Sequence, residues 1–142
     1  MTATARSVAP WVLGGGLVVA GIGHLTSQRD EFQAQVPDWF PVGADLVVVL
    51  SGVVEIGLGL TLILVSRRRA MVRWIVAVFF VVIFPGNVAQ WLEGTDAFGL
   101  DTDAKRFVRL FFQPVLIVWA LWSTDAWRTW RRGGLDTVLP RN

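Results

Sequence analysis

The chain has 142 residues, of which 54% are hydrophobic and 17% are charged, and its mean hydropathy is +0.53. A soluble domain of this size would carry more apolar surface than it could bury, so the composition favours a protein whose solvent is the lipid bilayer. The formal net charge is only +2. There is no cysteine, which excludes disulfides, thiolate metal sites and CxxC redox relays within this chain.

Four apolar segments, separated by charged connections, predict four membrane-spanning helices. The first ends in Gly-His-Leu-Thr without a small-x-small cleavage site, so we interpret it as a retained helix and not as a signal peptide. We expect an all-α membrane four-helix bundle that forms a single domain over residues 1–142. Its predicted spans are residues 8–25, 44–66, 71–92 and 107–122, and a basic tail follows at 123–142.

The connection between the first two spans has an amphipathic pattern of its own. Phe32, Val36 and Trp39 recur at helical spacing, and the sequence Pro-Asp-Trp-Phe-Pro at 37–41 interrupts the pattern. We expect a short interfacial helix on the outer leaflet, ended by this proline-rich turn.

The charges of the connections predict the orientation. One side would carry two acids and nine basic residues, and the other four basic residues and eight acids. Positive charge resists translocation, so we expect the basic side, and with it both termini, in the cytoplasm. The nine basic residues are Arg6, Arg67, Arg68, Arg69, Arg73, Arg128, Arg131, Arg132 and Arg141.

Two of the predicted spans combine a stripe of small residues with one ionisable side chain. Gly16 and Ala20 precede His24 at intervals of four, and Gly52 and Gly59 flank Glu55 at helical spacing. Membrane helices associate through such small residues, so we expect both ionisable side chains to face into the bundle. At a rise of ~1.5 Å per residue, the carboxyl group lies roughly 15 Å from the outer end of its helix.

The remaining polar residues of the spans also fall in their outer halves. Asn87 belongs to the third span, and Arg109 and Gln113 lie one turn apart in the fourth. A buried carboxylate costs several kcal/mol when unpaired, so we expect Glu55 to be protonated or partnered by one of these groups or by His24. Together the five side chains are a candidate proton or ligand site in an outward-facing polar pocket. The alternatives are a hydrogen-bond clamp between helices and, for the arginine, snorkelling to head groups.

Prolines and glycines predict breaks beside this polar set. Pro85 removes a backbone donor and kinks the third span, and Pro114 acts similarly near the top of the fourth. Gly86 permits the close approach of another backbone or of a ligand. We expect these three residues to line the site. A metal is not expected, because a lone histidine with one buried glutamate supplies too few ligands. The basic tail is expected to attract anionic lipid and not nucleic acid.

Several short motifs occur in an order and spacing that resembles the DoxX-like family of small four-helix bacterial membrane proteins. The motifs are Ala20-Gly-Ile-Gly-His-Leu25, Val36-Pro-Asp-Trp-Phe-Pro41, the sequence 50–59, Phe84-Pro-Gly-Asn-Val88 and Arg109-Leu-Phe-Phe-Gln-Pro114. The resemblance implies a bundle in the bacterial plasma membrane and a link to redox complexes such as thiosulfate:quinone oxidoreductase. The recurring polar positions of that family would correspond here to His24, Glu55, Asn87, Arg109 and Gln113.

Three functions follow as alternatives. The first is a redox-associated subunit that binds a quinone-like apolar small molecule and has no independent catalytic activity, with the electrons supplied by a partner oxidoreductase. The second is a membrane scaffold or assembly factor, whose acidic outer loops or arginine-rich face would bind a partner protein. The third is an oligomeric carrier of protons or small solutes. Membrane lipids are expected partners in every case, and self-association stays open.

Overall fold

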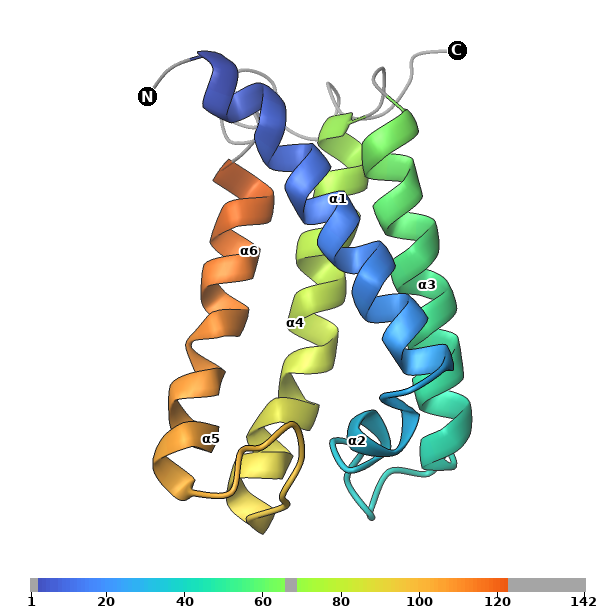
Figure 1. The fold of residues 1–142 in the computed structure, drawn as a ribbon, viewed down its shortest axis with the longest axis vertical. Helices are drawn as coiled ribbons and strands as arrows, with labels where there is room; N and C mark the ends of the chain where they lie inside the picture. The colour runs from blue at the N-terminus through green and yellow to red at the C-terminus, as the bar shows by residue number, and fades with distance from the viewer. Residues whose placement is uncertain (1–2, 66–68, 123–142) are drawn as a thin grey trace.

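The computed structural model describes residues 3–65 and 69–122, and the secondary structure within these ranges is entirely helical. The long helices run side by side, and the short α2 covers one end of the molecule (Figure 1). The expected basic tail lies outside the described residues. The helices are α1 (Ala3–Leu25), α2 (Arg29–Gln33), α3 (Ala44–Leu64), α4 (Arg69–Glu93), α5 (Asp103–Leu110) and α6 (Phe112–Trp122).

Three of these helices are long and apolar enough to cross a membrane, which indicates a membrane protein. Their apolar stretches are Val8–Leu25 in α1, Ala44–Leu64 in α3 and Met71–Glu93 in α4. They fall on the first three predicted spans. Large aliphatic side chains cover the outer faces of the molecule, as a lipid environment requires.

The fourth predicted span, residues 107–122, is not one continuous helix. α5 ends at Leu110, and α6 begins two residues later. Pro114 has no N–H to donate to the carbonyl of Leu110. The amide of Phe111 bonds the carbonyl of Val108, three residues earlier, at 3.1 Å, and this bond tightens the chain into a turn. The break expected near Pro114 is therefore present, but residues 107–122 do not form one helix that is long enough by itself to cross a membrane.

The predicted interfacial helix is present as α2, but it is only five residues long. It ends before Val36, so the pattern of Phe32, Val36 and Trp39 does not lie on a single helix. Turns continue the chain to Pro37, whose carbonyl accepts a hydrogen bond from the amide of Phe40 at 2.9 Å.

Helices α1 and α3 pack with their backbones in contact at two glycine pairs. A Cβ atom on Gly14 would lie 2.8 Å from the carbonyl oxygen of Gly59, and one on Gly21 would lie 2.6 Å from that of Gly52. Gly16, which was expected in this interface, has nothing within 4 Å of such an atom. At about 100° per residue, Gly14 and Gly21 lie to one side of His24, whereas Gly16 and Ala20 lie to the other. The small-residue stripe was therefore placed on the wrong face of α1.

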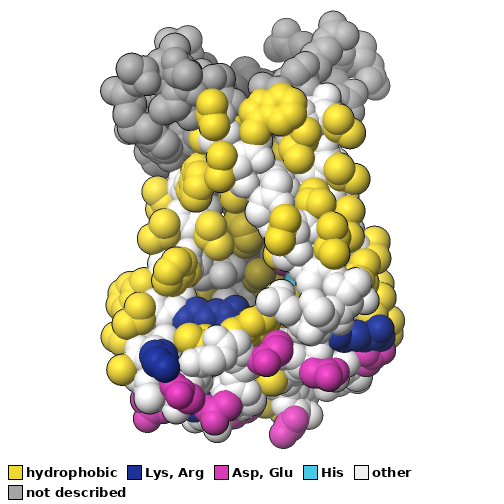
Figure 2. Space-filling model, viewed as in Figure 1, with side chains coloured by type: hydrophobic (Ala, Val, Ile, Leu, Met, Phe, Trp, Pro, Cys, Tyr) yellow, Lys and Arg dark blue, Asp and Glu magenta, His cyan; other side chains and the backbone are white. Residues whose placement is uncertain are grey.

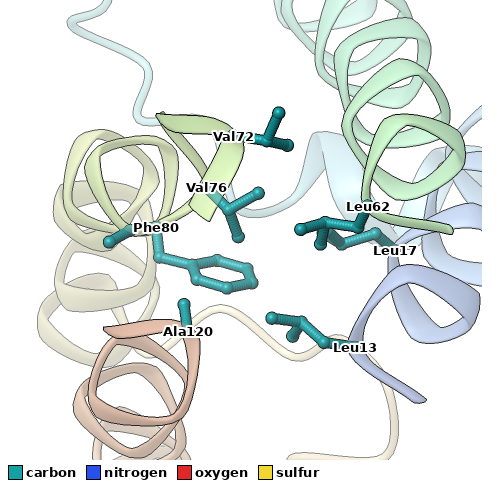
Figure 3. Close-up of a cluster of buried hydrophobic side chains, with 8 residues drawn as sticks. Leu13, Leu17, Leu62, Val72, Val76, Phe80 and Ala120 are labelled. Atoms are coloured by element: carbon teal, nitrogen blue, oxygen red, sulfur yellow. The ribbon is translucent and has the colours of Figure 1, made fainter. Parts of the chain in front are cut away.

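A hydrophobic core joins the α1–α3 pair to α4 and α6 toward the end opposite α2. Figure 3 shows the labelled side chains of this core converging, and they belong to α1, α3, α4 and α6. Phe80 is only 4% exposed, and Val76 and Ala120 are fully buried. This core packs the α1–α3 pair against the second pair, α4 and α6, at one end of the molecule. Toward the α2 end the two pairs are not joined by it, which leaves room for a space between them. The core consists of Leu13, Leu17, Leu62, Val72, Val76, Ala77, Phe80 and Ala120.

Candidate functional site

A cavity of about 830 Å³ lies between the α1–α3 pair and helices α4 and α6. Core side chains such as Leu13, Leu17 and Phe80 line the part of the cavity nearer the core. The part nearer α2 is lined by residues that follow this helix, namely Gln35, Val36, Pro37, Trp39 and Phe40. In the space-filling view the surface is hollowed between the half formed by α1 and α3 and the half formed by α5 and α6 (Figure 2). Cavities of 300–1,000 Å³ hold most small-molecule ligands, so this volume suits one apolar molecule.

All five polar residues that were singled out in the sequence line this one cavity. They are His24 from α1, Glu55 from α3, Asn87 from α4, Arg109 from α5 and Gln113 from α6. The rest of the wall is mostly aliphatic and aromatic. A mainly apolar cavity with a few convergent polar groups is the usual form of a small-molecule site.

His24 and Glu55 face each other across the α1–α3 interface. Nδ1 of the imidazole lies 3.0 Å from Oε2 of the carboxyl group, and both side chains are at least nine-tenths buried. The close approach at Gly52, where a Cβ atom would meet Cβ of His24 at 2.8 Å, brings the two side chains together. The two atoms are within ion-pair distance, but neither makes a hydrogen bond of ordinary geometry. The pair is therefore a buried polar contact between α1 and α3, and both of its residues border the cavity.

Asn87 and Gln113 form a second polar group on the opposite wall. Nδ2 of Asn87 donates to Oε1 of Gln113 at 3.2 Å, and Nε2 of Gln113 donates to the backbone carbonyl of Phe80 at 2.9 Å. Both amides are buried. These bonds connect α6 to α4 beside the core, and they fix the orientation of both side chains along the cavity wall.

Arg109 reaches the cavity from the end of α5, and uncharged groups surround it. Its Nη1 donates to Oε1 of Gln90 at 3.4 Å. The side-chain amide of Gln35 is assigned the orientation in which its oxygen faces donors. In this orientation Oε1 of Gln35 accepts from Nη1 and Nη2 of Arg109 at 2.5 and 2.7 Å. The guanidinium carbon also lies 5.1 Å from the ring centroid of Phe98, within cation–π range.

Aromatic rings connect the two sides of the site at the α2 end. The rings of His24 and Phe32 meet edge to face with centroids 3.5 Å apart, and Phe32 meets Phe98 in the same manner at 4.7 Å. The backbone amide of Phe98 also donates to the carboxylate of Glu31. Helix α2 and the connection at 94–102 thus close this end of the site. Phe32 contacts the imidazole of His24, and Phe98 contacts the guanidinium group of Arg109.

The three residues expected at helix breaks differ in their position. Pro85 and Gly86 line the cavity, whereas Pro114 is exposed and is not among the lining residues. A Cβ atom on Gly86 would lie 2.8 Å from the backbone carbonyl oxygen of Gln35, so this glycine accommodates the backbone that follows α2. Helix α4 continues through Pro85 without ending.

Gln35 and Phe32 belong to the site, although the sequence had not singled them out as site residues. Both lie on the connection between α1 and α3, where polarity and aromaticity alone are ordinary. The available signal was Gly86, because a glycine within a membrane helix indicates that another backbone approaches there.

Ion pairs stabilise the connections around the site. Arg29 binds both carboxylate oxygens of Asp45 at 2.7 and 2.6 Å, and this hydrogen-bonded contact raises the pKa of the guanidinium. The side chain of Lys105 donates to Asp101 at 2.6 Å, which holds the pKa of that carboxyl group below its usual value. Within residues 3–65 and 69–122, no group of three histidine, cysteine or carboxylate residues is placed to hold a metal ion.

Comparisons with known proteins correct the family assignment. A family model, described as a domain of unknown function (DUF8561), matches residues 13–124. No curated protein and no solved structure matches the chain. The resemblance to the DoxX-like family was therefore wrong, because its motifs consist of glycine, proline and single polar residues that many small membrane proteins use at helix contacts. Since the family match covers most of its length, the chain belongs to the DUF8561 family.

Proposed function

We propose that this protein binds an amphipathic, quinone-like small molecule in the cavity between its two helix pairs. The observation that carries the proposal is the combination of an apolar cavity of about 830 Å³ with the few polar side chains that converge on it, among them the buried His24–Glu55 pair. The aliphatic wall suits an apolar body, and the polar groups suit one compact oxygen-bearing head. The redox association expected earlier came from the family resemblance, and it is not part of this proposal.

The arrangement of the helices supports entry from the bilayer. The hollow is on the lateral face between α1 and α6, with apolar side chains above and beside it and a basic side chain along its lower edge (Figure 2). Lipid tails would contact this face if α1, α3 and α4 cross the membrane. A molecule dissolved in the bilayer could then enter sideways and keep its apolar body out of water throughout.

A binding assay with two glycine variants tests the proposal. Gly16 lines the cavity, whereas the neighbouring Gly15 does not, and a Cβ atom on either would have nothing within 4 Å. The leucine of Gly16→Leu would occupy ligand space, so binding of an alkyl-quinone analogue, followed by quenching of tryptophan fluorescence in nanodiscs, should weaken by about tenfold or more. Gly15→Leu is the matched control and should bind as the unmodified protein does. Equal binding by both variants would contradict a ligand in this cavity.

The same proposal includes a topology of four passes with both termini in the cytoplasm. Helix α1 begins and α6 ends at the same end of the molecule, opposite α2 (Figure 1). The nine arginines that the sequence predicts at that end support a cytoplasmic position for both termini. The consecutive α5 and α6 would together make the fourth pass.

The absence of cysteine makes this topology simple to test. Single cysteines introduced at Ser27 and Thr102 should react with a membrane-impermeant maleimide in intact cells. A cysteine at Thr4 should react only after the membrane is opened. Labelling of Thr4→Cys in intact cells would contradict the orientation, and unequal labelling of Ser27→Cys and Thr102→Cys would contradict four passes.

A further inference from the structure

Arg109 is a cavity-lining cation without a counter-charge among the residues that the structure describes. Its partners are the neutral amide oxygens of Gln90 and Gln35 and the ring of Phe98. None of the ion pairs found in residues 3–65 and 69–122 includes it. Arg109 is half-buried, so its guanidinium group loses part of its hydration, and neutral acceptors offset only part of that loss.

Arg106, one turn earlier on α5, shows how the same helix compensates a buried guanidinium that has a structural role. That side chain bonds the carboxylates of Asp96 and Asp103 and also the backbone carbonyl of Thr95. It is only 8% exposed and does not line the cavity. Arg109, which lies on the same helix but lines the cavity, has no such carboxylate partners among the described residues.

The other ionisable groups of the cavity wall do not supply the missing negative charge. They are His24 and Glu55, which lie within ion-pair distance of each other. The carboxyl group of Glu55 is thus engaged with the imidazole, and no carboxylate of the described residues lies at ion-pair distance from Arg109.

We propose that the ligand has an anionic head group and that Arg109 binds it. This inference rests on the proposed function and narrows its ligand class to amphiphiles with a compact, negatively charged oxygen head on an apolar body. A guanidinium group has five donors in a planar fork that matches two neighbouring oxygens. Within the quinone-like class, a hydroxyquinone ionised at neutral pH offers such a pair, namely its oxide and the adjacent carbonyl.

Two probes of matched shape test the inference in nanodiscs of uncharged lipid. One is a 3-alkyl-2-hydroxy-1,4-naphthoquinone, which is an anion at neutral pH, and the other is its neutral 2-methoxy ether. The unmodified protein should bind the anion about tenfold more tightly, which corresponds to ~1.4 kcal/mol. Arg109→Gln should remove this preference, because the group that distinguishes the anion from the ether is then lost. Arg109→Lys should retain part of the preference, because the charge stays but the planar fork is lost.

Lys105→Gln is the matched charge control. It removes one positive charge from the same helix, but at an exposed position outside the cavity, so the preference for the anion should persist. Equal affinities for the two probes in the unmodified protein would overturn the inference, as would a preference that survives Arg109→Gln at unchanged thermal stability. Either result would leave the proposed function standing. Failure of both probes to bind, in every variant, would instead contradict the proposed function itself.

Discussion

Replacing Gly21 by alanine perturbs the contact that brings α1 and α3 together. The new Cβ atom would lie 2.6 Å from the carbonyl oxygen of Gly52 and 2.7 Å from Cγ1 of Ile56, whereas ordinary contact begins at 3.4 Å. The shortfall is about 0.8 Å (3.4 less 2.6 Å). Because the oxygen belongs to the backbone, the helices themselves must separate. Their separation would also move His24 away from Glu55.

The magnitude follows from two opposing effects. Overfilling a packed interface costs ~1–3 kcal/mol, and the replacement of a helical glycine by alanine gains ~0.5–1 kcal/mol. The mid-range values, ~2 and ~0.75 kcal/mol, differ by about 1 kcal/mol, and we expect Gly21→Ala to lower the free energy of unfolding by about that amount. In Gly15→Ala, on the same helix, a Cβ atom would have nothing within 4 Å, so only the gain remains.

Reversible unfolding in mixed micelles, followed by circular dichroism as the fraction of denaturing detergent rises, measures both variants against the unmodified protein. The order of stability should be Gly15→Ala first, the unmodified protein second and Gly21→Ala last. If the two variants agreed within ~0.5 kcal/mol, α1 and α3 would not be in backbone contact at Gly21, and the geometry derived for the His24–Glu55 pair would be wrong.

Three further results are expected. Gln113→Leu should lower the free energy of unfolding by roughly 0.6–1.7 kcal/mol in the same assay, because it removes the bond to Phe80 and leaves the buried amide of Asn87 without its acceptor. Glu55→Gln should weaken alkyl-quinone binding several-fold, because it changes the partner of His24. Glu93→Gln, at the exposed end of α4, is the control and should leave binding unchanged. Equal effects of the two variants would argue against a specific role for the buried carboxyl group. The pKa of Asp101 is lowered in the folded protein by Lys105, so the stabilisation by this pair is complete above the ordinary carboxyl pKa of 3.8 and is lost as the pH falls through the lowered value. Protection of the amides at the start of α5, relative to the intrinsic exchange rate at each pH, should therefore fall only in acid, and Asp101→Asn should reduce that acid dependence.

The apolar helices could be predicted because hydropathy is a local property of the sequence. Runs of aliphatic residues place α1, α3 and α4 within a few residues of their positions in the structure. The break between α5 and α6 was harder to place. Pro114 signals a lost hydrogen bond four residues earlier, but it does not tell whether the helix bends or stops, which depends on how the neighbouring turn closes.

The site was partly predictable for a similar reason. His24 and Glu55 each accompany small residues, and that pattern places polar side chains toward a neighbouring helix. The choice of the face of α1 failed because residues 14–16 are all glycine, so candidates for a contact exist on both sides of His24. Gln35 was missed because its position depends on the tertiary approach of its backbone to Gly86.

Native mass spectrometry of the protein extracted in lipid nanodiscs most directly tests whether the cavity holds a ligand. The spectrum should show one small molecule bound per chain in the unmodified protein and in Gly15→Leu. The same adduct should be lost from Gly16→Leu, because that side chain fills the cavity. An adduct retained equally in all three proteins, or absent from all three, would contradict a ligand-binding role for the space between the two helix pairs.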